Sequence, residues 1–234
     1  MSHDTLIEFD TRRRLRAEPT PPCYQPALSL QTGDLAAIRA VQHRTMLSTT
    51  RSWPETAAIW LALPPRALAA HTFPLELRGM LRGAGLAQSR VSLELPEAAA
   101  MAINPDGLLR LSALRDIGVG LILTEFGGSI ASLSSLKRLP LTAMALSPVV
   151  VRGLPADRED AGLVRAAITV AHTLGLAVIA DGVVSADQSA WLAGEGCTAG
   201  LGKLFGAPMS AQRLGDWLAG TCQPGAVAAI KRGD

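Results

Sequence analysis

Residues 160–182, DAGLVRAAITVAHTLGLAVIADG, contain one complete helix-and-strand unit, and this unit indicates the fold class. The first part, Asp160–Leu174, has apolar residues at helical spacing and predicts an amphipathic helix. The residues expected on its buried face are Leu163, Ala167, Val170 and Leu174. The run Ala177–Ala180 that follows is short and apolar, as in a strand covered on both faces of a parallel sheet.

The same unit recurs along the chain. Strands are predicted at Ile59–Leu63, Val91–Leu95, Val119–Leu123, Ala143–Leu146 and Ala177–Ala180. Helices are predicted at Leu75–Leu86, Pro105–Ile117, Ser129–Leu139, Asp160–Leu174 and Ala186–Gly194. At least five βα units in succession predict an α/β fold, either a closed barrel or an open doubly wound sheet, and the pattern alone does not separate these two. No Gly-x-Gly-x-x-Gly motif follows an early strand, which weakens the dinucleotide-binding version of the open sheet.

Length and composition predict one globular domain. The chain has 234 residues, of which 48% are hydrophobic and only 4% aromatic, which suits helices packed closely on a buried parallel sheet. A proline cluster at residues 18–22 ends a polar N-terminal stretch. We therefore expect a flexible tail at 1–22, a barrel domain at 23–220 and a C-terminal tail at 221–234.

Charge and cysteine usage argue against several classes of partner. The formal net charge is +2, and the most basic run, residues 12–16, has no interleaved aromatic residue, so we expect no nucleic-acid partner. Three widely spaced cysteines without a Cys-x-x-Cys pair predict neither a disulfide framework nor a zinc site, and they fit a reducing cytoplasm. The N-terminus has no apolar core for a signal peptide, and the apolar runs are too short to cross a membrane.

Acidic residues follow several predicted strands. Glu94 and Glu97 lie in LELPE, Glu125 follows the strand that ends at Leu123, and Asp181 follows Ala180. In a barrel these positions meet at the mouth formed by the carboxyl ends of the strands. Converging carboxylates are the ligands that Mg²⁺ or Mn²⁺ requires. A second interpretation is that Glu97 and Asp181 only cap the helices that follow them.

Seven segments of the chain match the motifs of one known family in order. They are YQPALSLQTG at 24–33, LELPE at 93–97, TEFG at 124–127, SLSSLKRLP at 132–140, AHTLGL at 171–176, ADGVV at 180–184, and a last segment from Gly196 to Pro208. Over residues 24–214 the chain resembles the EAL-domain family of cyclic di-GMP phosphodiesterases. The resemblance implies an EAL-type TIM-like (β/α) barrel. It also implies the loss of an outer helical segment, because only Thr45–Ala58 connects two motifs that the family separates by two helices; core packing of Trp53 and Trp60 is nonetheless expected.

The resemblance also implies that much of the family's catalytic set is replaced. The positions where the family has metal-binding or catalytic residues, and this chain has others, are Arg39, Ala62, Thr124, Ala145, Val184 and Leu201. The carboxylates that remain as a residual site are Glu94, Glu125 and Asp181. The candidates for contact with a ligand are Gln25, His43 and Arg44.

These substitutions predict a catalytically inactive regulatory protein of cyclic di-GMP-related bacterial signalling that acts through a protein partner, with a homodimer as a further option. We expect Arg39 to form an ion pair with the remaining carboxylates in place of a metal. No cofactor is expected, and Mg²⁺ or Mn²⁺ would bind only if Glu94, Glu125 and Asp181 suffice. The alternatives are a metal-independent cyclic di-GMP receptor and a phosphodiesterase with an altered metal site.

Overall fold

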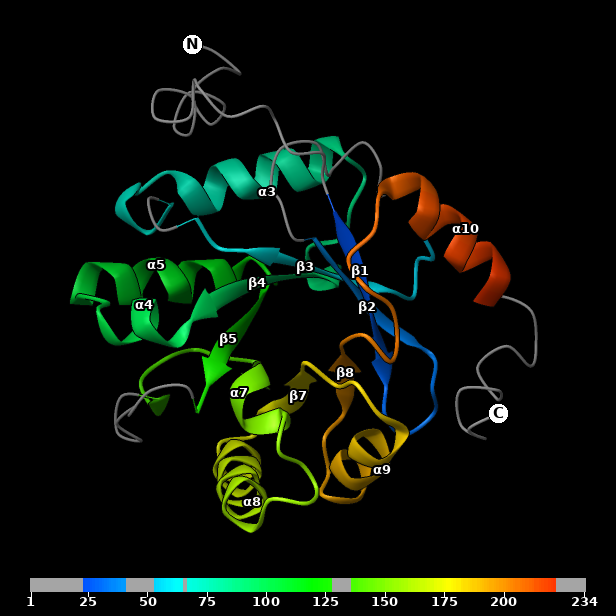
Figure 1. The fold of residues 1–234 in the computed structure, drawn as a ribbon. Helices are drawn as coiled ribbons and strands as arrows, with labels where there is room; N and C mark the ends of the chain where they lie inside the picture. The colour runs from blue at the N-terminus through cyan, green and yellow to red at the C-terminus, as the bar shows by residue number, and fades with distance from the viewer. Residues whose placement is uncertain (1–22, 41–52, 65–66, 128–135, 222–234) are drawn as a thin grey trace, which may run out of the picture.

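The computed structural model describes residues 23–40, 53–64, 67–127 and 136–221 (Figure 1). Two candidate ligand contacts, His43 and Arg44, lie outside these residues. Most of the predicted helix Ser129–Leu139 lies outside them as well.

The strands of the described residues form one closed barrel in sequence order. They are β1 Tyr24–Ser29, β2 Leu35–Ala40, β3 Ala58–Ala62, β4 Val91–Pro96, β5 Gly120–Phe126, β6 Ala143–Leu146, β7 Ala177–Asp181 and β8 Ala199–Leu201. The barrel implied by the resemblance is therefore confirmed, and the open doubly wound sheet is wrong. All five strands predicted from the apolar runs are present, with ends that differ by at most three residues.

Strand β1 differs from the other strands of the barrel, because it runs antiparallel to both β2 and β8. The cause is the short connection from β1 to β2, in which Gly33 adopts a φ of 79°. A connection this short can join only antiparallel neighbours, whereas a parallel pair needs a long crossover. The pairs from β2 through β8 are all parallel.

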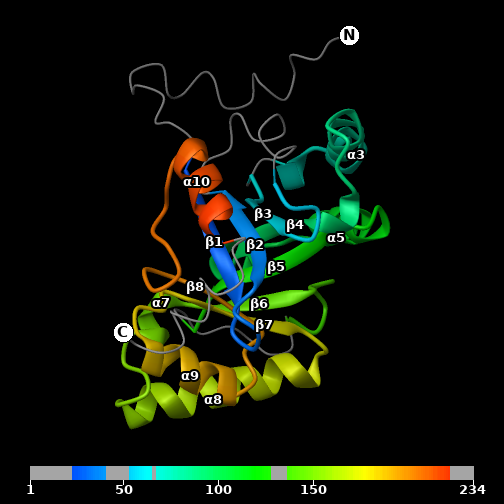
Figure 2. The same ribbon diagram turned by 90° about the vertical axis from the view of Figure 1, so that its right-hand side faces the viewer.

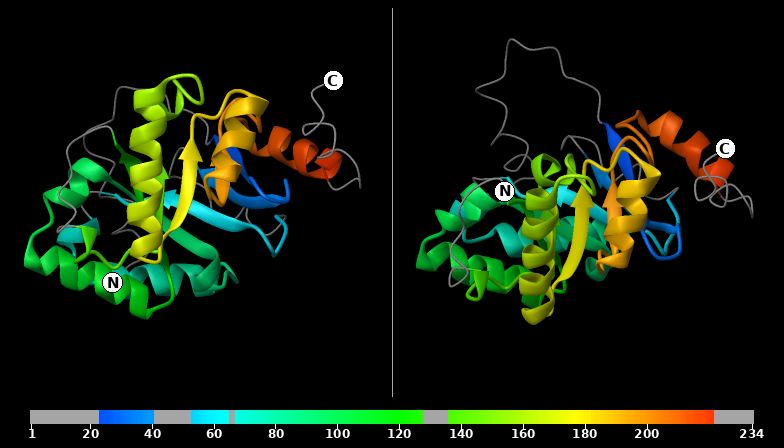
Figure 3. Two further views of the ribbon diagram at one scale, coloured as in Figure 1. Left: turned by 90° about the horizontal axis from the view of Figure 1, so that it is seen from below. Right: turned by 60° about the horizontal axis from the view of Figure 1, so that its bottom comes forward.

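Helices surround the barrel wall (Figures 1 and 3). They are α3 Phe73–Gly83, α4 Glu97–Met101, α5 Pro105–Asp116, α7 Pro148–Val151, α8 Arg158–Thr173, α9 Ala186–Gly194 and α10 Ala211–Thr221, with short 3₁₀ turns η2 Ala67–Ala69 and η3 Gln88–Arg90. Local sequence sets several of the starts: Asn104 caps α5, Asp157 caps α8, and Ser185 with Gln188 forms a capping box on α9. Figure 2 shows α10 beside β1.

The buried face of α8 differs from the predicted one. Leu163 is 60% exposed. The residues buried against the barrel are Ala161, Val164, Ile168 and Ala171. The helix is apolar around much of its circumference, so spacing alone does not identify the inner face. Small residues at Ala161 and Ala171 let the helix approach the strands closely, while Ala167, Val170 and Leu174 pack at the edge of the contact.

The strand residues divide into two clusters by the alternation of side chains along each strand. Outward residues such as Ile38, Leu93 and Leu123 pack against the helices in the larger cluster. Inward residues form a second cluster in the barrel interior, consisting of Ala27, Ala37, Trp60, Ile122, Ala143, Ala145, Ile179, Ala199 and Leu201. Most of these are alanine, and Trp60 is the one aromatic ring in this inner cluster.

Two contacts hold the residues just before β3 against the barrel. The Arg90 guanidinium donates hydrogen bonds to the carbonyl oxygens of Pro54 (2.8 Å) and Ala57 (3.0 and 3.2 Å). The ring of Trp53 meets that of Tyr24 edge-on, with centroids 5.2 Å apart. Both Trp53 and Trp60 are buried, as expected; residues 45–52 of the shortened connection lie outside the described residues.

Candidate functional site: an ion-paired arginine in the barrel mouth

Strand alternation directs three of the substituted positions, Arg39, Ala145 and Leu201, toward the barrel interior. Ala145 and Leu201 belong to the inner cluster, and Arg39 is the register neighbour of the inner Trp60. Ala62 pairs with Glu94 in the register of β3 and β4. A set read from scattered motifs thus comes together at the carboxyl ends of the strands, where barrels place their chemistry.

Arg39 is the centre of this site. Its Nε lies 2.7 Å from Oε1 of Glu94, and its Nη1 lies 2.7 Å from Oδ2 of Asp181. The side chains of Arg39 and Asp181 are each 20% exposed and that of Glu94 is 9% exposed, so the triad is shielded but open to solvent at one side. The predicted ion pair is present, and it engages two carboxylates.

Burial and charge set the protonation of the triad. Burial alone lowers the pKa of Arg39, but the charges of Glu94 and Asp181 outweigh this effect and hold that pKa above its ordinary value, so the guanidinium stays protonated. Burial raises the pKa of Glu94, and Arg39 only partly opposes this rise. The arginine therefore limits the rise in the pKa of this buried carboxylate.

The predicted cluster of three carboxylates does not form. Glu125 is exposed and has a φ of 64°, at a point where the register between β5 and β6 shifts. Within the described residues, no three His, Cys, Asp or Glu side chains gather closely enough to hold a metal ion. The donor set does not fit Mg²⁺ or Mn²⁺, because the two carboxylates that do converge are both bonded to Arg39.

Other polar side chains of the barrel serve the fold. The Gln25 amide, predicted to contact a ligand, donates to the carbonyl oxygen of Gly206 (3.1 Å) and is buried. The hydroxyl of Ser147 accepts a hydrogen bond from the Val149 N–H (3.3 Å) at the start of α7. Thr124 is buried.

The capping interpretation of the two acidic residues is wrong for Asp181, whose carboxylate bonds to Arg39 while Ser185 caps α9. At α4 the N-cap is Pro96, and Glu97 is a buried residue of the first turn. Trp60 also faces the site and is not among the residues predicted for it. Side chains alternate between the two faces of β3, whose sequence is AIWLA. Trp60 pairs with Arg39 on the neighbouring strand, and this register predicts that its ring points inward.

The chain is similar to proteins of one known family. The family model described as the EAL domain matches residues 31–208. The chain belongs to the EAL-domain family. It is similar to the cyclic di-GMP phosphodiesterase NbdA of Pseudomonas aeruginosa, with 35% identity over 61% of this chain and 18% of that protein. It is also similar to the cyclic di-GMP phosphodiesterase PdeR of Escherichia coli, with 33% identity over 65% of this chain and 23% of that protein.

Solved EAL-domain structures agree with the fold. The PaMucR phosphodiesterase in complex with c-di-GMP has a TM-score of 0.74 and 25% identity, covering 82% of this chain and 93% of that one. The EAL domain of Mycobacterium smegmatis DcpA has a TM-score of 0.80 and 24% identity, covering 85% and 97%. The chain spans about a fifth of the curated relatives' length. Among the described residues, no helix is long and apolar enough to cross a membrane.

Proposed function

We propose that this EAL domain does not hydrolyse cyclic di-GMP and instead regulates cyclic di-GMP-related signalling through contact with a protein partner. The observation that carries the proposal is the Arg39 guanidinium bonded to Glu94 and Asp181. Metal-assisted hydrolysis needs cations that activate water and stabilise the leaving oxygen, and carboxylates free to hold those cations. A fixed guanidinium repels a divalent cation and competes for the same oxygens.

The charge of the site also argues against the receptor alternative. One guanidinium faces two carboxylates, so the triad adds no positive charge with which to bind the phosphates of a nucleotide. The carbonyl oxygen of Gly206 already accepts a hydrogen bond from the side-chain amide of Gln25. These contacts favour a mouth without a nucleotide.

Two exposed valines support a protein partner. Val149 on α7 is 65% exposed, and Val184, just after β7, is 53% exposed. Their segments touch, since a Cβ on Gly182 would come within 2.8 Å of the Pro148 Cβ. Apolar side chains exposed on adjoining segments at the rim are suited to a protein contact.

Hydrolysis and binding assays test the proposal. The purified chain is incubated with cyclic di-GMP and Mg²⁺ or Mn²⁺, with PdeR as the active control, and the linear dinucleotide is measured by chromatography. We expect no turnover. Turnover that Asp181→Asn abolishes would overturn the proposal in favour of an altered metal site.

Calorimetric titration with cyclic di-GMP, with and without metal, addresses the receptor function. Tight binding without turnover would replace the regulator by a receptor. The partner function is tested by comparing the proteins co-purified with the wild-type chain and with Val149→Glu and Val184→Glu variants. We expect a specific partner to be lost in both variants and retained in Arg213→Ala, which changes an exposed residue of α10.

A further inference from the structure

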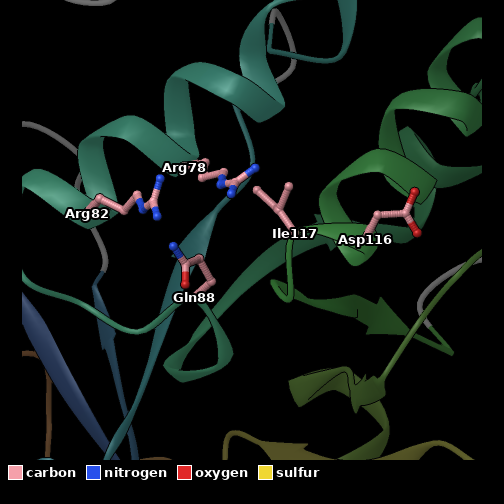
Figure 4. A pocket seen from close by; sticks show the side chains of 5 residues that line it. All are labelled: Arg78, Arg82, Gln88, Asp116 and Ile117. Atoms are coloured by element: carbon pink, nitrogen blue, oxygen red, sulfur yellow. The ribbon is translucent and has the colours of Figure 1, made fainter.

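A hollow of about 250 Å³ lies between α3, the turn before β4 and the end of α5 (Figure 4). It is lined by Arg78, Arg82, Gln88, Asp116 and Ile117. The arginines come from α3, Gln88 lies in the turn that precedes β4, and Asp116 and Ile117 lie at the end of α5, ahead of β5. These segments enter the strands rather than leave them, so the hollow is separate from the Arg39 site.

The fold makes no use of the polar side chains in this hollow. Within the described residues, no ion pair or side-chain hydrogen bond involves Arg78, Arg82 or Asp116. The same holds for the side-chain amide of Gln88 in that part of the chain. By contrast, the guanidinium groups of Arg90 and Arg115 bond to backbone carbonyls and serve the structure directly.

The helix α3 presents its two arginines together. Arg78 and Arg82 are four residues apart and therefore share one face of the helix. Each is followed by a glycine, Gly79 or Gly83, where an added Cβ would meet nothing within 4 Å. Both arginines are exposed, so their side chains are open to solvent.

The lining selects a phosphate group. Each guanidinium offers a fork of N–H donors, and the Gln88 amide adds a third donor group. A carboxylate is satisfied by one fork, whereas a phosphate has enough oxygens to accept from both arginines and the amide. A volume of about 250 Å³ exceeds that of an ion alone, because a water molecule takes up about 30 Å³.

We propose that this hollow binds a small phosphate ester, with its phosphate between Arg78 and Arg82 and its remaining atoms over Ile117. In Figure 4 Asp116 lies beyond Ile117 from the two arginines. Its carboxylate accepts a hydrogen bond from a donor group of the ligand, such as an amino group. The ligand class is therefore a phosphorylated molecule that carries a donor at its other end.

Titration followed by NMR tests the site in the intact chain. Inorganic phosphate and GMP are the two probes, and the Gln88 side-chain amide is the local reporter. Both probes should shift this signal, and GMP should bind several-fold more tightly because it also reaches Ile117 and Asp116. Arg78→Ala and Arg82→Ala should each weaken GMP binding about tenfold, the loss expected for one charge-assisted contact.

Two further variants make the result specific. Arg213→Ala removes the same charge from an exposed site on α10 and should change the affinity less than twofold. Asp116→Ala removes both the negative charge and the acceptor, so it should strengthen binding of inorganic phosphate and reduce the advantage of GMP. The proposal is overturned if neither probe shifts Gln88, or if Arg213→Ala weakens binding as much as the α3 variants. Since the assay involves neither cyclic di-GMP nor a divalent metal, its outcome is independent of the proposed function.

Discussion

The guanidinium of Arg39 on β2 lies 2.7 Å from a carboxylate oxygen of Glu94 on β4, although β3 separates the two strands. The same guanidinium reaches Asp181 on β7, four strands beyond β3. One side chain thus bridges three strands across the barrel interior. Glu94 and Asp181 depend on Arg39 for compensation of their charges.

Arg39→Ala should destabilise the barrel strongly, by about 3 kcal/mol in free energy of unfolding at pH 7.5, because it leaves Glu94 buried without a partner. Burial already raises the pKa of Glu94, and deletion of Arg39 removes the interaction that lowers it. In the folded variant Glu94 therefore holds its proton to higher pH than in the unfolded chain, where the carboxyl group ionises at its ordinary pKa of 4.5. Its deficit should shrink as pH falls from 7.5 toward 4.5, as measured by urea unfolding at several pH values.

Glu94→Gln is the matched control for that experiment. It keeps an acceptor for Arg39, leaves the bond to Asp181 intact and removes the group that burial disfavours, so it should cost little stability. A deficit of Arg39→Ala that is the same at pH 5 and pH 7.5 would contradict the assigned role of Glu94.

Arg39→Glu should convert the mouth into a cation site. The variant places a third carboxylate beside Glu94 and Asp181, and three converging carboxylates are suited to Mn²⁺. We expect Mn²⁺ to bind the variant and to raise its melting temperature, as measured by calorimetry and thermal unfolding. Arg39→Gln removes the same positive charge without adding a carboxylate, and equal Mn²⁺ binding by both variants would contradict the geometry.

Substitution of Gly162 and of Gly202 by alanine should change the stability of the chain in opposite directions. Gly162 lies in α8 with open space where a Cβ would be, so Gly162→Ala should stabilise the chain by about 1 kcal/mol. Gly202 has a φ of 153°, and a Cβ there would overlap the backbone of Val183, so Gly202→Ala should destabilise by more than 1 kcal/mol. Thermal unfolding of both variants checks this, and a stable Gly202→Ala would contradict the close approach.

Cys197 should be almost unreactive in the folded chain. Burial, with a smaller effect from Glu195, raises the pKa of its thiol to about 12, and alkylation needs the thiolate. In a Cys222→Ser background, iodoacetamide at pH 8 should label the half-buried Cys23 first and Cys197 only after urea is added. The thiol's contribution to stability is complete below the ordinary value of 9.0 and declines as pH rises toward 12. Rapid labelling without urea, detected by mass spectrometry, would contradict the burial of this residue.

The corrected face of α8 can be tested by a pair of substitutions. Ile168 is buried against the barrel, so Ile168→Ala should cost about 3 kcal/mol, whereas Leu163→Ser at an exposed site should cost about 0.5 kcal/mol or less. Urea unfolding measures both. Comparable losses in free energy of unfolding would contradict the exposure of Leu163 and support the face predicted from the sequence.

Local patterns in the sequence predicted the strands and the family but not every orientation. The runs that became β4 and β6 are apolar and bounded by polar residues, so their positions follow from a simple period. The inner face of α8 depends on which apolar stripe fits closely against the strands, which is a property of the assembled pair. The antiparallel direction of β1 depends on the tight connection at Gly33.

The candidate site was predictable only in part for a similar reason. Motif order identified Arg39, and opposite charge predicted its ion pair with the remaining acids. The exposure of Glu125 depends on its φ of 64° and on the register shift of β5, neither of which a strand pattern contains. The α3 hollow combines side chains from three segments, and sequence spacing connects only Arg78 with Arg82.

The separation of the barrel residues into an outward and an inward cluster has a consequence for how such a domain changes over time. Exchanges at outward positions alter the contact with the helices and are subject to selection for folding. Exchanges at the mouth leave that contact in place and alter the groups that face the site, provided that charges stay compensated as Arg39 compensates Glu94 and Asp181. A lineage can therefore give up a reaction residue by residue while its shell persists, and the shell then remains available for another use.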